Sequence, residues 1–320
     1  MYWDLNLVSA KIFAPIIIVF GFTGNLLGLI TISKKALSKM GPHSVFICMF
    51  AMDFIYFPLI FHPYLAYAFG INVTAMSNEA CKLYWYARYS MAIISPMMNV
   101  YISVERWISI TYPSKRLILL KRNVQIIYIF VIIVVNLAFA TQVAIGFELQ
   151  HVIIETPIGN SSEHTEHIVY YCDFKSLYWQ DVAGFIDISI RVIAPVGLMV
   201  VFSFLVCVSI YRSRNRISRS HATGNATLRK DVRFSLVCMS LNVFYIVFSL
   251  PVSVVVLLQD YSGNQYYIPF SYWFFLDYSA GFYLMIGFNK RFRRAFLEMF
   301  CVKFENSSPA HVDNNLRNTA

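Results

Sequence analysis

The sequence predicts an all-α membrane protein, a bundle of seven transmembrane helices followed by a short amphipathic eighth helix. Hydrophobic residues make up 58% of the 320 residues, and charged residues make up only 13%, roughly half the share that is usual in a soluble domain. The hydrophobic residues fall in seven blocks, each long enough for the ~20 residues that a helix needs to cross a bilayer. Because backbone groups in lipid must bond within their own segment, we expect each block to be a helix.

The seven predicted spans follow one another along the chain, and a long loop, residues 148–182, separates the fourth from the fifth. They cover residues 12–34, 44–69, 82–111, 124–147, 183–211, 233–258 and 266–288. Residues 1–11 form a short N-terminal segment, 289–300 the amphipathic eighth helix, and 301–320 a polar tail. We expect no second folded domain. We also expect no cleaved signal peptide, because no basic region followed by a short apolar run and a cleavage site stands at the start.

The distribution of positive charge sets the orientation of the spans. Most of the 26 lysines and arginines lie in the loops and tail on one side, which we assign to the cytoplasm. Lys11, Lys82 and Lys175 lie on the other side, together with the N-terminus. The net charge of +9 is therefore explained by topology and by contact with anionic membrane lipids, and a nucleic-acid partner is not expected.

Several other classes of protein are disfavoured. A transporter or channel would need a polar path through several spans or symmetry between two halves, but the interiors of the first, fourth and sixth spans carry no charge and no repeat is present. The six cysteines include no CxxC pair, so a zinc site is not expected. No nucleophile–base pair or phosphate-binding loop points to an enzyme.

The third span carries three marks at fixed places: Cys81 at its start, Ser95 near its middle and Glu105-Arg106-Trp107 at its end. Cys81 and Arg106 are separated by roughly 37 Å of helix, more than the ~30 Å hydrocarbon core of a bilayer. This pattern resembles the third helix of rhodopsin-like (class A) G protein-coupled receptors. Further matching marks are Gly24-Asn25, Asp53 in the second span, Pro113, and the prolines that would kink helices five and six, Pro195 and Pro251.

The chain also departs from the family pattern in several places, among them a fourth span without its usual tryptophan and Ser203 where helix five often has a tyrosine. Ser249 replaces the tryptophan that usually precedes the proline of helix six, and Gly281-Phe282-Tyr283-Leu284-Met285 stands where the family has Asn-Pro-x-x-Tyr. Asp277 replaces a usual asparagine, and Pro96 lies in the middle of the third helix. These departures leave the expected fold intact and leave the details of activation open.

The resemblance implies a switch on the cytoplasmic side that involves Glu105, Arg106, Trp107 and Asp231. Arg106 would pair with Glu105 at rest, and a second pair with Asp231 would hold helices three and six together. Losing that pair would open the cytoplasmic ends for a heterotrimeric G protein, and arrestin is a further expected partner. The alternative is a solvated charge pair without a switching role.

The resemblance also implies a site for a sodium ion among Asp53, Ser95 and Asp277. Two carboxyl groups that lie close together either bind a cation or share a proton, and the sequence leaves these two possibilities open. A purely structural hydrogen bond of Asp53 is a third reading. No other cofactor is expected.

Three covalent features are expected from the resemblance and from short motifs. Cys81 and Cys172 would form a disulfide on the oxidising side of the membrane. Asn72 and Asn160 lie in Asn-x-Ser/Thr sequences on that side and are expected to carry glycans. Cys301, after the eighth helix, is in a position that favours palmitoylation, and an unmodified thiol is the alternative.

The ligand pocket is expected near the extracellular end of the third helix. Phe275 stands where opsins have the lysine that holds retinal, and Arg88 stands where amine receptors have an aspartate, so both ligand classes are disfavoured. Arg88 is a candidate anchor for a ligand carboxylate or carbonyl, or else part of a structural salt bridge. Asp187 lies four residues before Arg191, so these two are expected to pair along one helix face.

The expected ligand is a short basic and aromatic neuropeptide. The extracellular surface is acidic, which would attract a cation, and the predicted pocket has aromatic residues for arginine or aromatic side chains: Tyr84, Trp85, Tyr272 and Trp273. The same aromatics could instead form the usual interfacial belt. The sequence therefore predicts a peptide receptor of the plasma membrane. A chemosensory or lipid receptor of the same fold, or a receptor that signals poorly, is the alternative.

Overall fold

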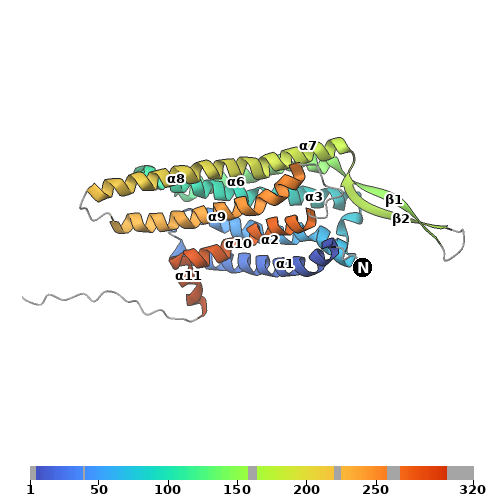
Figure 1. Cartoon of the computed structure of the whole chain (residues 1–320), viewed down its shortest axis with the longest axis horizontal. Helices are drawn as coiled ribbons and strands as arrows, with labels where there is room; N and C mark the ends of the chain where they lie inside the picture. Colours follow the sequence, from blue (N-terminus) through green and yellow to red (C-terminus); the bar gives the residue numbers. More distant parts are fainter. Residues whose placement is uncertain (1–4, 39, 158–163, 220–224, 258–266, 301–320) are drawn as a thin grey trace, which may run out of the picture.

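The computed structural model describes residues 5–38, 40–157, 164–219, 225–257 and 267–300, and for some of these, Asp231 among them, only the backbone. Within this part of the chain, seven helical rods lie side by side along the long axis of the molecule (Figure 1). The rods are α1 (Leu5–Ile32), α2 (His43–Phe69), α3 (Asn78–Ala92) with α4 (Ile94–Thr111), α6 (Arg122–Gly146), α7 (Leu177–Ile188) with the π-helical turn η3 (Ser189–Ile193) and α8 (Ala194–Arg219), α9 (Asn225–Leu257), and α10 (Tyr267–Phe288). The predicted seven-helix bundle is confirmed.

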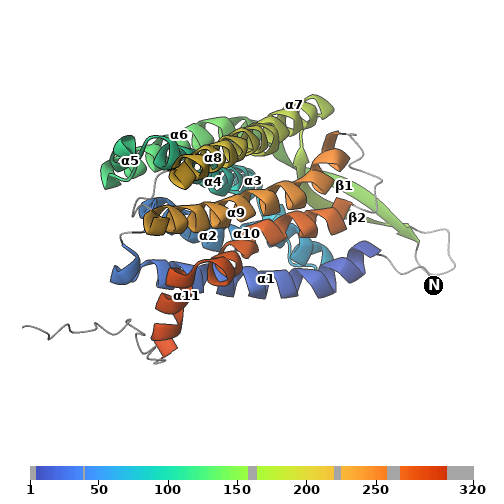
Figure 2. The same ribbon diagram turned by 60° about the vertical axis from the view of Figure 1, so that its left-hand side comes forward.

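The two ends of the bundle differ in their connections. A hairpin of β1 (Phe147–Pro157) and β2 (His164–Phe174) projects from one end, where α1 also begins, and η2 (Val73–Ala75) lies there too. At the opposite end α11 (Lys290–Leu297) turns away from α10 (Figure 2) and is followed by η4 (Glu298–Phe300). That end also holds η1 (Lys35–Leu37) and α5 (Pro113–Leu119). These ends are called the hairpin end and the α11 end below.

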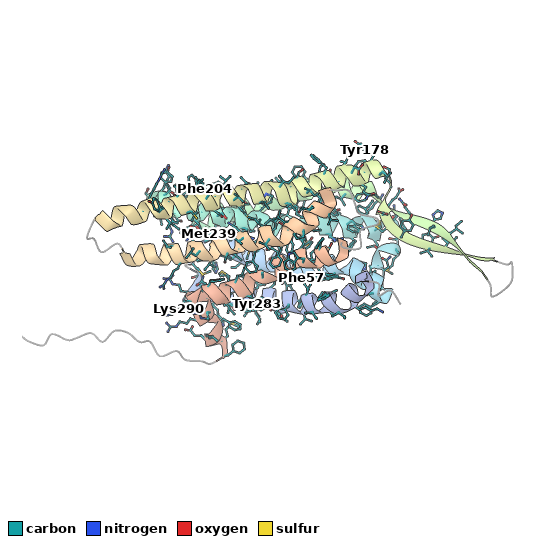
Figure 3. All side chains as sticks on the ribbon, in the orientation of Figure 1. Phe57, Tyr178, Phe204, Met239, Tyr283 and Lys290 are labelled. Atoms are coloured by element: carbon teal, nitrogen blue, oxygen red, sulfur yellow. A yellow bond between two sulfur atoms is a disulfide. The ribbon has the colours of Figure 1, made fainter. Side chains whose placement is uncertain are left out.

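Apolar side chains cover the outside of the bundle, as expected for a surface in lipid. Phe204 on α8 is 67% exposed and projects away from the neighbouring helices (Figure 3). Among the described residues, five helical segments are long and apolar enough to cross a membrane: Lys11–Ile32, His43–His62, Arg122–Gly146, Leu177–Ser213 and Val232–Val255. The third rod is not among these segments because it is divided and carries charged residues. Helix α10 is not among them because its tyrosines, its serines and Asp277 lower its mean hydropathy.

Among the described residues, the two larger clusters of the interior are rich in aromatic side chains and lie one above the other along the bundle. The cluster at the α11 end includes Phe46, Phe50 and Met98, and the cluster at the hairpin end includes Tyr56 and Phe61. Helices α1 and α2 approach closely because α1 has glycines where the rings of α2 lie. A Cβ atom on Gly28 would lie 2.7 Å from the ring of Phe50, so a larger residue would push the two helices apart.

The third helix is divided, which corrects the prediction of one continuous helix over 82–111. The break falls at Ile93, three residues before Pro96. A proline has no N–H group, so Pro96 cannot bond the carbonyl of Ala92 one turn earlier. The hydroxyl of Tyr278 on α10 donates to that carbonyl at 2.8 Å, which replaces the missing helical bond with a bond between two helices.

Three other proline-released carbonyls have the same kind of partner. Each lies four residues before a proline and accepts a hydrogen bond from an aromatic side chain on another element. The pairs are Leu59 (before Pro63) with the Tyr84 hydroxyl, Arg191 (before Pro195) with the Tyr245 hydroxyl, and Val247 (before Pro251) with the Trp273 Nε1 at 3.3 Å. These bonds satisfy polar groups that would otherwise lack a partner in the membrane.

The hairpin was not predicted from the sequence. Its strands pair in register from Phe147 opposite Phe174 to Pro157 opposite His164, and both strands are rich in the β-branched and aromatic residues that favour strands. A disulfide joins Cys172 of β2 to Cys81 at the start of α3. The ring of Phe147 stacks on Trp85 of α3 at 4.6 Å. The hairpin base is therefore fixed to the third helix.

The amphipathic helix predicted over 289–300 corresponds to α11 and η4. The side chain of Asn289 caps α11 by accepting bonds from the backbone N–H groups of Arg291 and Phe292, at 3.1 and 3.2 Å. Phe292 is fully buried against the rings of Phe50 and Phe282. The helix is therefore attached by one apolar face, and its basic residues remain exposed.

Replacing Tyr278 by Phe tests the bond to the released carbonyl. The ring stays, but the Ala92 carbonyl loses its donor inside the membrane, so the free energy of unfolding should fall by about 1–3 kcal/mol. Thermal unfolding of the purified protein in detergent measures the loss.

The matched control is Tyr283→Phe, because Tyr283 bonds the Phe20 carbonyl at 3.2 Å, four residues before a glycine and not a proline. This substitution should lower the free energy of unfolding much less than Tyr278→Phe does. In a Pro96→Ala background the effect of Tyr278→Phe should shrink, since residue 96 can then bond Ala92. Equal losses in the two backgrounds would contradict the explanation.

Candidate functional site

A cavity of about 190 Å³ opens at the hairpin end of the bundle. Its wall combines residues from α2, α3, η3, α7 and the base of the hairpin, elements that lie far apart in the sequence. The lining residues are Tyr56, Trp85, Arg88, Tyr89, Ala92, Phe147, Asp173, Phe174, Gln180, Gly184, Asp187 and Arg191. Of the residues predicted for a ligand pocket, Trp85, Arg88 and Asp187 lie here.

The charged side chains of this cavity are arranged around one ion pair. Asp187 and Arg191 lie one turn apart, and their O–N distance is 2.5 Å, so the geometry shows the expected pair. Arg88 stacks over Trp85, with its guanidinium carbon 4.7 Å from the ring centroid, and lies close enough to Tyr56 and Asp187 to interact with both. Two guanidinium groups and one carboxylate thus occupy the deep part of the cavity, and Asp173 stands exposed at its rim.

A second cavity of about 290 Å³ lies on the other side of Trp85. It is lined by Ala66, Asn72, Thr74, Tyr84, Trp85, Tyr171 and Cys172. Tyr84, predicted for the ligand pocket, lines this second cavity instead, because its hydroxyl reaches the Leu59 carbonyl on α2. The second cavity is aromatic and has no charged residue in its wall.

Two predicted pocket residues lie elsewhere. Tyr272 is 3% exposed and stacks on Phe61 inside the bundle, whereas Trp273 is 43% exposed and packs against Phe248 of α9. Neither is among the described residues that line the two cavities. The prediction placed them near the mouth from their position along α10, but the rotation of α10 about its own axis directs them to other neighbours.

A polar site lies in the middle of the bundle. The hydroxyl of Ser95 donates to the carboxylate of Asp53 at 3.1 Å, and both residues are 5% exposed. Asp277 on α10 lies close enough to interact electrostatically with Asp53. The described residues contain no group of three or more His, Cys, Asp or Glu side chains that suits a transition metal. The oxygen donors of the two carboxylates and the hydroxyl suit a small hard cation or a shared proton.

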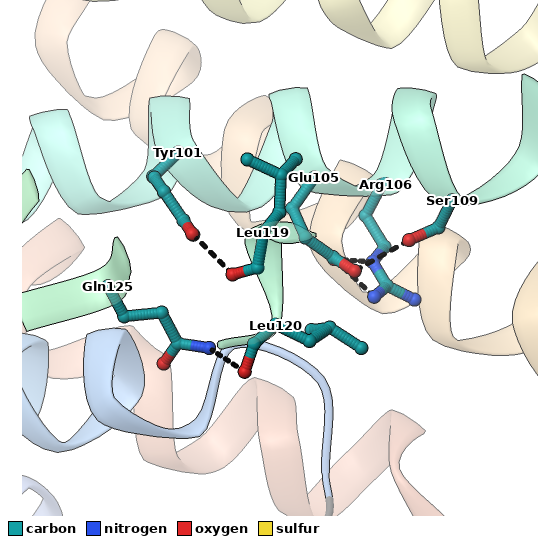
Figure 4. A network of polar contacts seen from close by, with 7 residues as sticks. All are labelled: Tyr101, Glu105, Arg106, Ser109, Leu119, Leu120 and Gln125. Carbon is teal, nitrogen blue, oxygen red and sulfur yellow. Dashed lines mark hydrogen bonds and ion pairs between the residues drawn. The ribbon is translucent and has the colours of Figure 1, made fainter. Parts of the chain in front are cut away.

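The α11 end of α4 contains a buried ion pair. Glu105 and Arg106 are 0% and 2% exposed, and their side chains form an ion pair. Ser109 donates to the second oxygen of Glu105 at 2.6 Å (Figure 4). Nearby, the Tyr101 hydroxyl donates to the Leu119 carbonyl, and the Gln125 side chain donates to the Leu120 carbonyl. These two bonds hold α5 against α4 and α6.

The other predicted switch residues are placed differently. Trp107 does not join the buried pair but packs against Phe202 of α8. The side chain of Asp231 lies outside the described residues. The guanidinium of Arg106 instead faces the ring of Phe234 on α9, with 4.4 Å between its carbon and the ring centroid. Phe234 could not be identified from the sequence, because nothing in its local pattern points to Arg106.

The predicted modification sites are partly described. Asn72 is exposed, and its side-chain oxygen accepts a bond from the Thr74 hydroxyl at 2.7 Å. Asn160 and Cys301 lie outside the described residues. Pro195 follows the π-helical turn η3, and Pro251 lies inside α9.

The sequence model of the family described as 7 transmembrane receptor (rhodopsin family) matches residues 24–281. The match runs from the middle of α1 into α10 and includes both cavities, the central polar site and the Glu105–Arg106 pair. Members of this family are multi-pass membrane receptors that recognise a ligand and signal through a G protein, and they are not enzymes. The chain belongs to the rhodopsin family of seven-transmembrane receptors.

Proposed function

We propose that this receptor binds a short peptide from outside the cell at the hairpin end and activates a heterotrimeric G protein at the α11 end. The charge arrangement of the hairpin-end cavity carries the proposal. The orientation is supported by the Cys81–Cys172 disulfide at the hairpin end, since disulfides persist in oxidising surroundings. The concentration of Lys and Arg in the loops at the α11 end supports the same orientation.

The hairpin favours a cationic ligand. In its register Glu148 stands opposite Asp173, and Glu155 stands opposite Glu166. Like charges at directly opposite positions destabilise a pair of strands, and a bound cation would relieve that repulsion. Between these pairs Ile153 stands opposite Ile168, and both are more than half exposed, which suits an apolar or aromatic part of the same ligand.

The deep part of the cavity favours a different group. Among the lining residues that the structure describes, the deep wall carries the guanidinium groups of Arg88 and Arg191 and the carboxylate of Asp187, which pairs with Arg191. A carboxylate or the carbonyl of an amidated C-terminus would accept hydrogen bonds from a guanidinium there, whereas an ammonium group would be repelled. A short peptide with basic and aromatic residues and a terminal acceptor satisfies both regions, as a neuropeptide does.

A lipid or chemosensory ligand is the second candidate, because the two arginines would also bind the carboxylate of a fatty acid. The acidic hairpin disfavours it, since it would repel an anion on its way to the cavity.

The remaining features fit signalling. Glu105, Arg106 and Asp231 are proposed to form the switch that the G protein reads, and arrestin is proposed to bind the same end. Asp53, Ser95 and Asp277 are proposed to hold a sodium ion or a shared proton. A glycan on Asn72 or Asn160, a palmitoyl group on Cys301 and residence in the plasma membrane complete the proposal.

The first test measures second-messenger output in cells that express the receptor, challenged with amidated basic peptides, free-acid peptides, amines and fatty acids. We expect a response to a peptide and its loss in Arg106→Ala. Arg88→Gln should weaken the potency of that peptide by about 10- to 100-fold, the loss expected for one charge-assisted hydrogen bond.

The matched control is Lys82→Gln, which removes one positive charge from the same helix outside the cavity and should change potency little. A response to fatty acids alone would replace the peptide by a lipid. Equal potency of the Arg88→Gln variant and the wild-type receptor would reject Arg88 as the anchor.

The central polar site is tested by comparing thermal unfolding in sodium chloride and in choline chloride. If a sodium ion binds the folded state, stability should rise with sodium concentration, by about 1.4 kcal/mol at ten times the dissociation constant. Asp53→Asn should abolish the sodium effect, whereas Ser33→Ala, which alters an exposed serine, should leave it intact. An unfolding temperature of the wild-type receptor that is equal in both salts would exclude sodium and favour a shared proton.

A further inference from the structure

Arg106 is the largest fully buried side chain among the described residues. In the proposed function, on which this inference rests, a G protein reads Arg106, yet the side chain is only 2% exposed. Two groups contact its guanidinium, one from its own helix and one from a neighbouring helix. Glu105 on the same helix provides the counter-charge, and Phe234 on α9 provides the face of its ring, 4.4 Å from the guanidinium carbon.

The Phe234 ring is itself held in place by the start of α2 and the loop before it. Phe46 on α2 meets the ring edge-to-face, with 6.2 Å between centroids. Gly41 lies in the loop with a φ of +36°, and a Cβ there would lie 3.0 Å from the Phe234 ring and 3.4 Å from a guanidinium nitrogen of Arg106. The loop therefore packs tightly against Phe234 and Arg106, and a side chain larger than that of glycine at position 41 would crowd both.

The contact between Arg106 and Phe234 joins two helices that otherwise share no charge pair among the described residues. A guanidinium removed from water is costly unless its charge is compensated. The negative face of an aromatic ring supplies part of that compensation, and it does so from α9. A movement of α9 away from α4 would therefore remove the ring and leave the guanidinium accessible at the α11 end.

We propose that Phe234 is the residue that positions Arg106 and locks α4 to α9 in the resting receptor. The lock is a cation–π contact clamped by Phe46 and Gly41. It needs no carboxylate on α9, so it is distinct from the pair between Arg106 and Asp231. Breaking it shifts the population towards receptors in which Arg106 is exposed.

The first measurement is basal second-messenger output per receptor at the cell surface, which requires no ligand. Phe234→Leu removes the ring face and should raise basal output by about three- to tenfold, the shift expected when a partly desolvated cation–π contact is lost. Phe234→Tyr keeps the face and should match the wild-type receptor. If the Leu variant does not reach the surface, Phe234→Met replaces it with the same expected rise.

The matched control is Phe244→Leu. Phe244 lies on the same helix and is half-buried, but its ring packs against Phe248 and not against Arg106. Its basal output should equal that of the wild-type receptor.

The second measurement does not depend on coupling to a G protein. Cys238 is 2% exposed and lies close enough to Arg106 and Glu105 to interact with both, so it is covered when α9 is closed. In the purified full-length receptor, the rate at which a maleimide alkylates Cys238, followed by mass spectrometry, should rise in Phe234→Leu by the same factor as basal output and stay unchanged in Phe234→Tyr and Phe244→Leu.

The two measurements separate the inference from the proposed function. Faster alkylation without higher basal output supports the lock and rejects signalling through a G protein. Alkylation in Phe234→Leu at the wild-type rate overturns the lock. A rise of the same size in Phe244→Leu or in Phe234→Tyr overturns it too, because the effect would then not come from the ring face above Arg106.

Discussion

The fold depends on one constraint: inside a membrane, a backbone carbonyl without a partner is too costly to keep. The bundle contains prolines in several of its helices, and each of four prolines releases a carbonyl one turn earlier. Aromatic donors on neighbouring elements fill these four places, from Tyr84, Tyr278, Tyr245 and Trp273. The resulting bonds join α2 to α3, α3 to α10, η3 to α9, and α9 to α10. The prolines thus convert bonds within helices into bonds between them.

Two of these bonds start from the wall of the cavity at the hairpin end. Ala92 and Arg191 both line the cavity, and their carbonyls accept bonds from Tyr278 on α10 and Tyr245 on α9. Arg191 is engaged twice, because its side chain pairs with Asp187 while its carbonyl is bonded to α9. A ligand that disturbs the Asp187–Arg191 pair therefore acts on the π-helical turn η3, to which α9 is hydrogen-bonded through Tyr245. The geometry links the cavity to the helix that carries Phe234.

The fully or partly buried charges are concentrated at the places where the function is proposed. Arg88, Asp187 and Arg191 lie in the cavity, Asp53 and Asp277 in the middle of the bundle, and Glu105 with Arg106 at the α11 end. Charges at these depths are expensive in a membrane protein and usually mark function. Each group is compensated by partners on more than one helix, so each depends on how the helices are arranged. This dependence suits a receptor, in which a change at one end must alter the other.

The sequence by itself determined the seven spans, the amphipathic segment after them and the pair that lies one turn apart on one helix, Asp187 with Arg191. These follow from hydropathy, charge and helical spacing, all of which are local. Only the tertiary structure decided which way α10 turns Tyr272 and Trp273, which cavity receives Tyr84, where the third helix breaks to meet Tyr278, and that Phe234 covers Arg106. A helix that is apolar on all sides carries no pattern that fixes its rotation. Contacts between residues more than a hundred positions apart form only when the packed bundle brings the helices together.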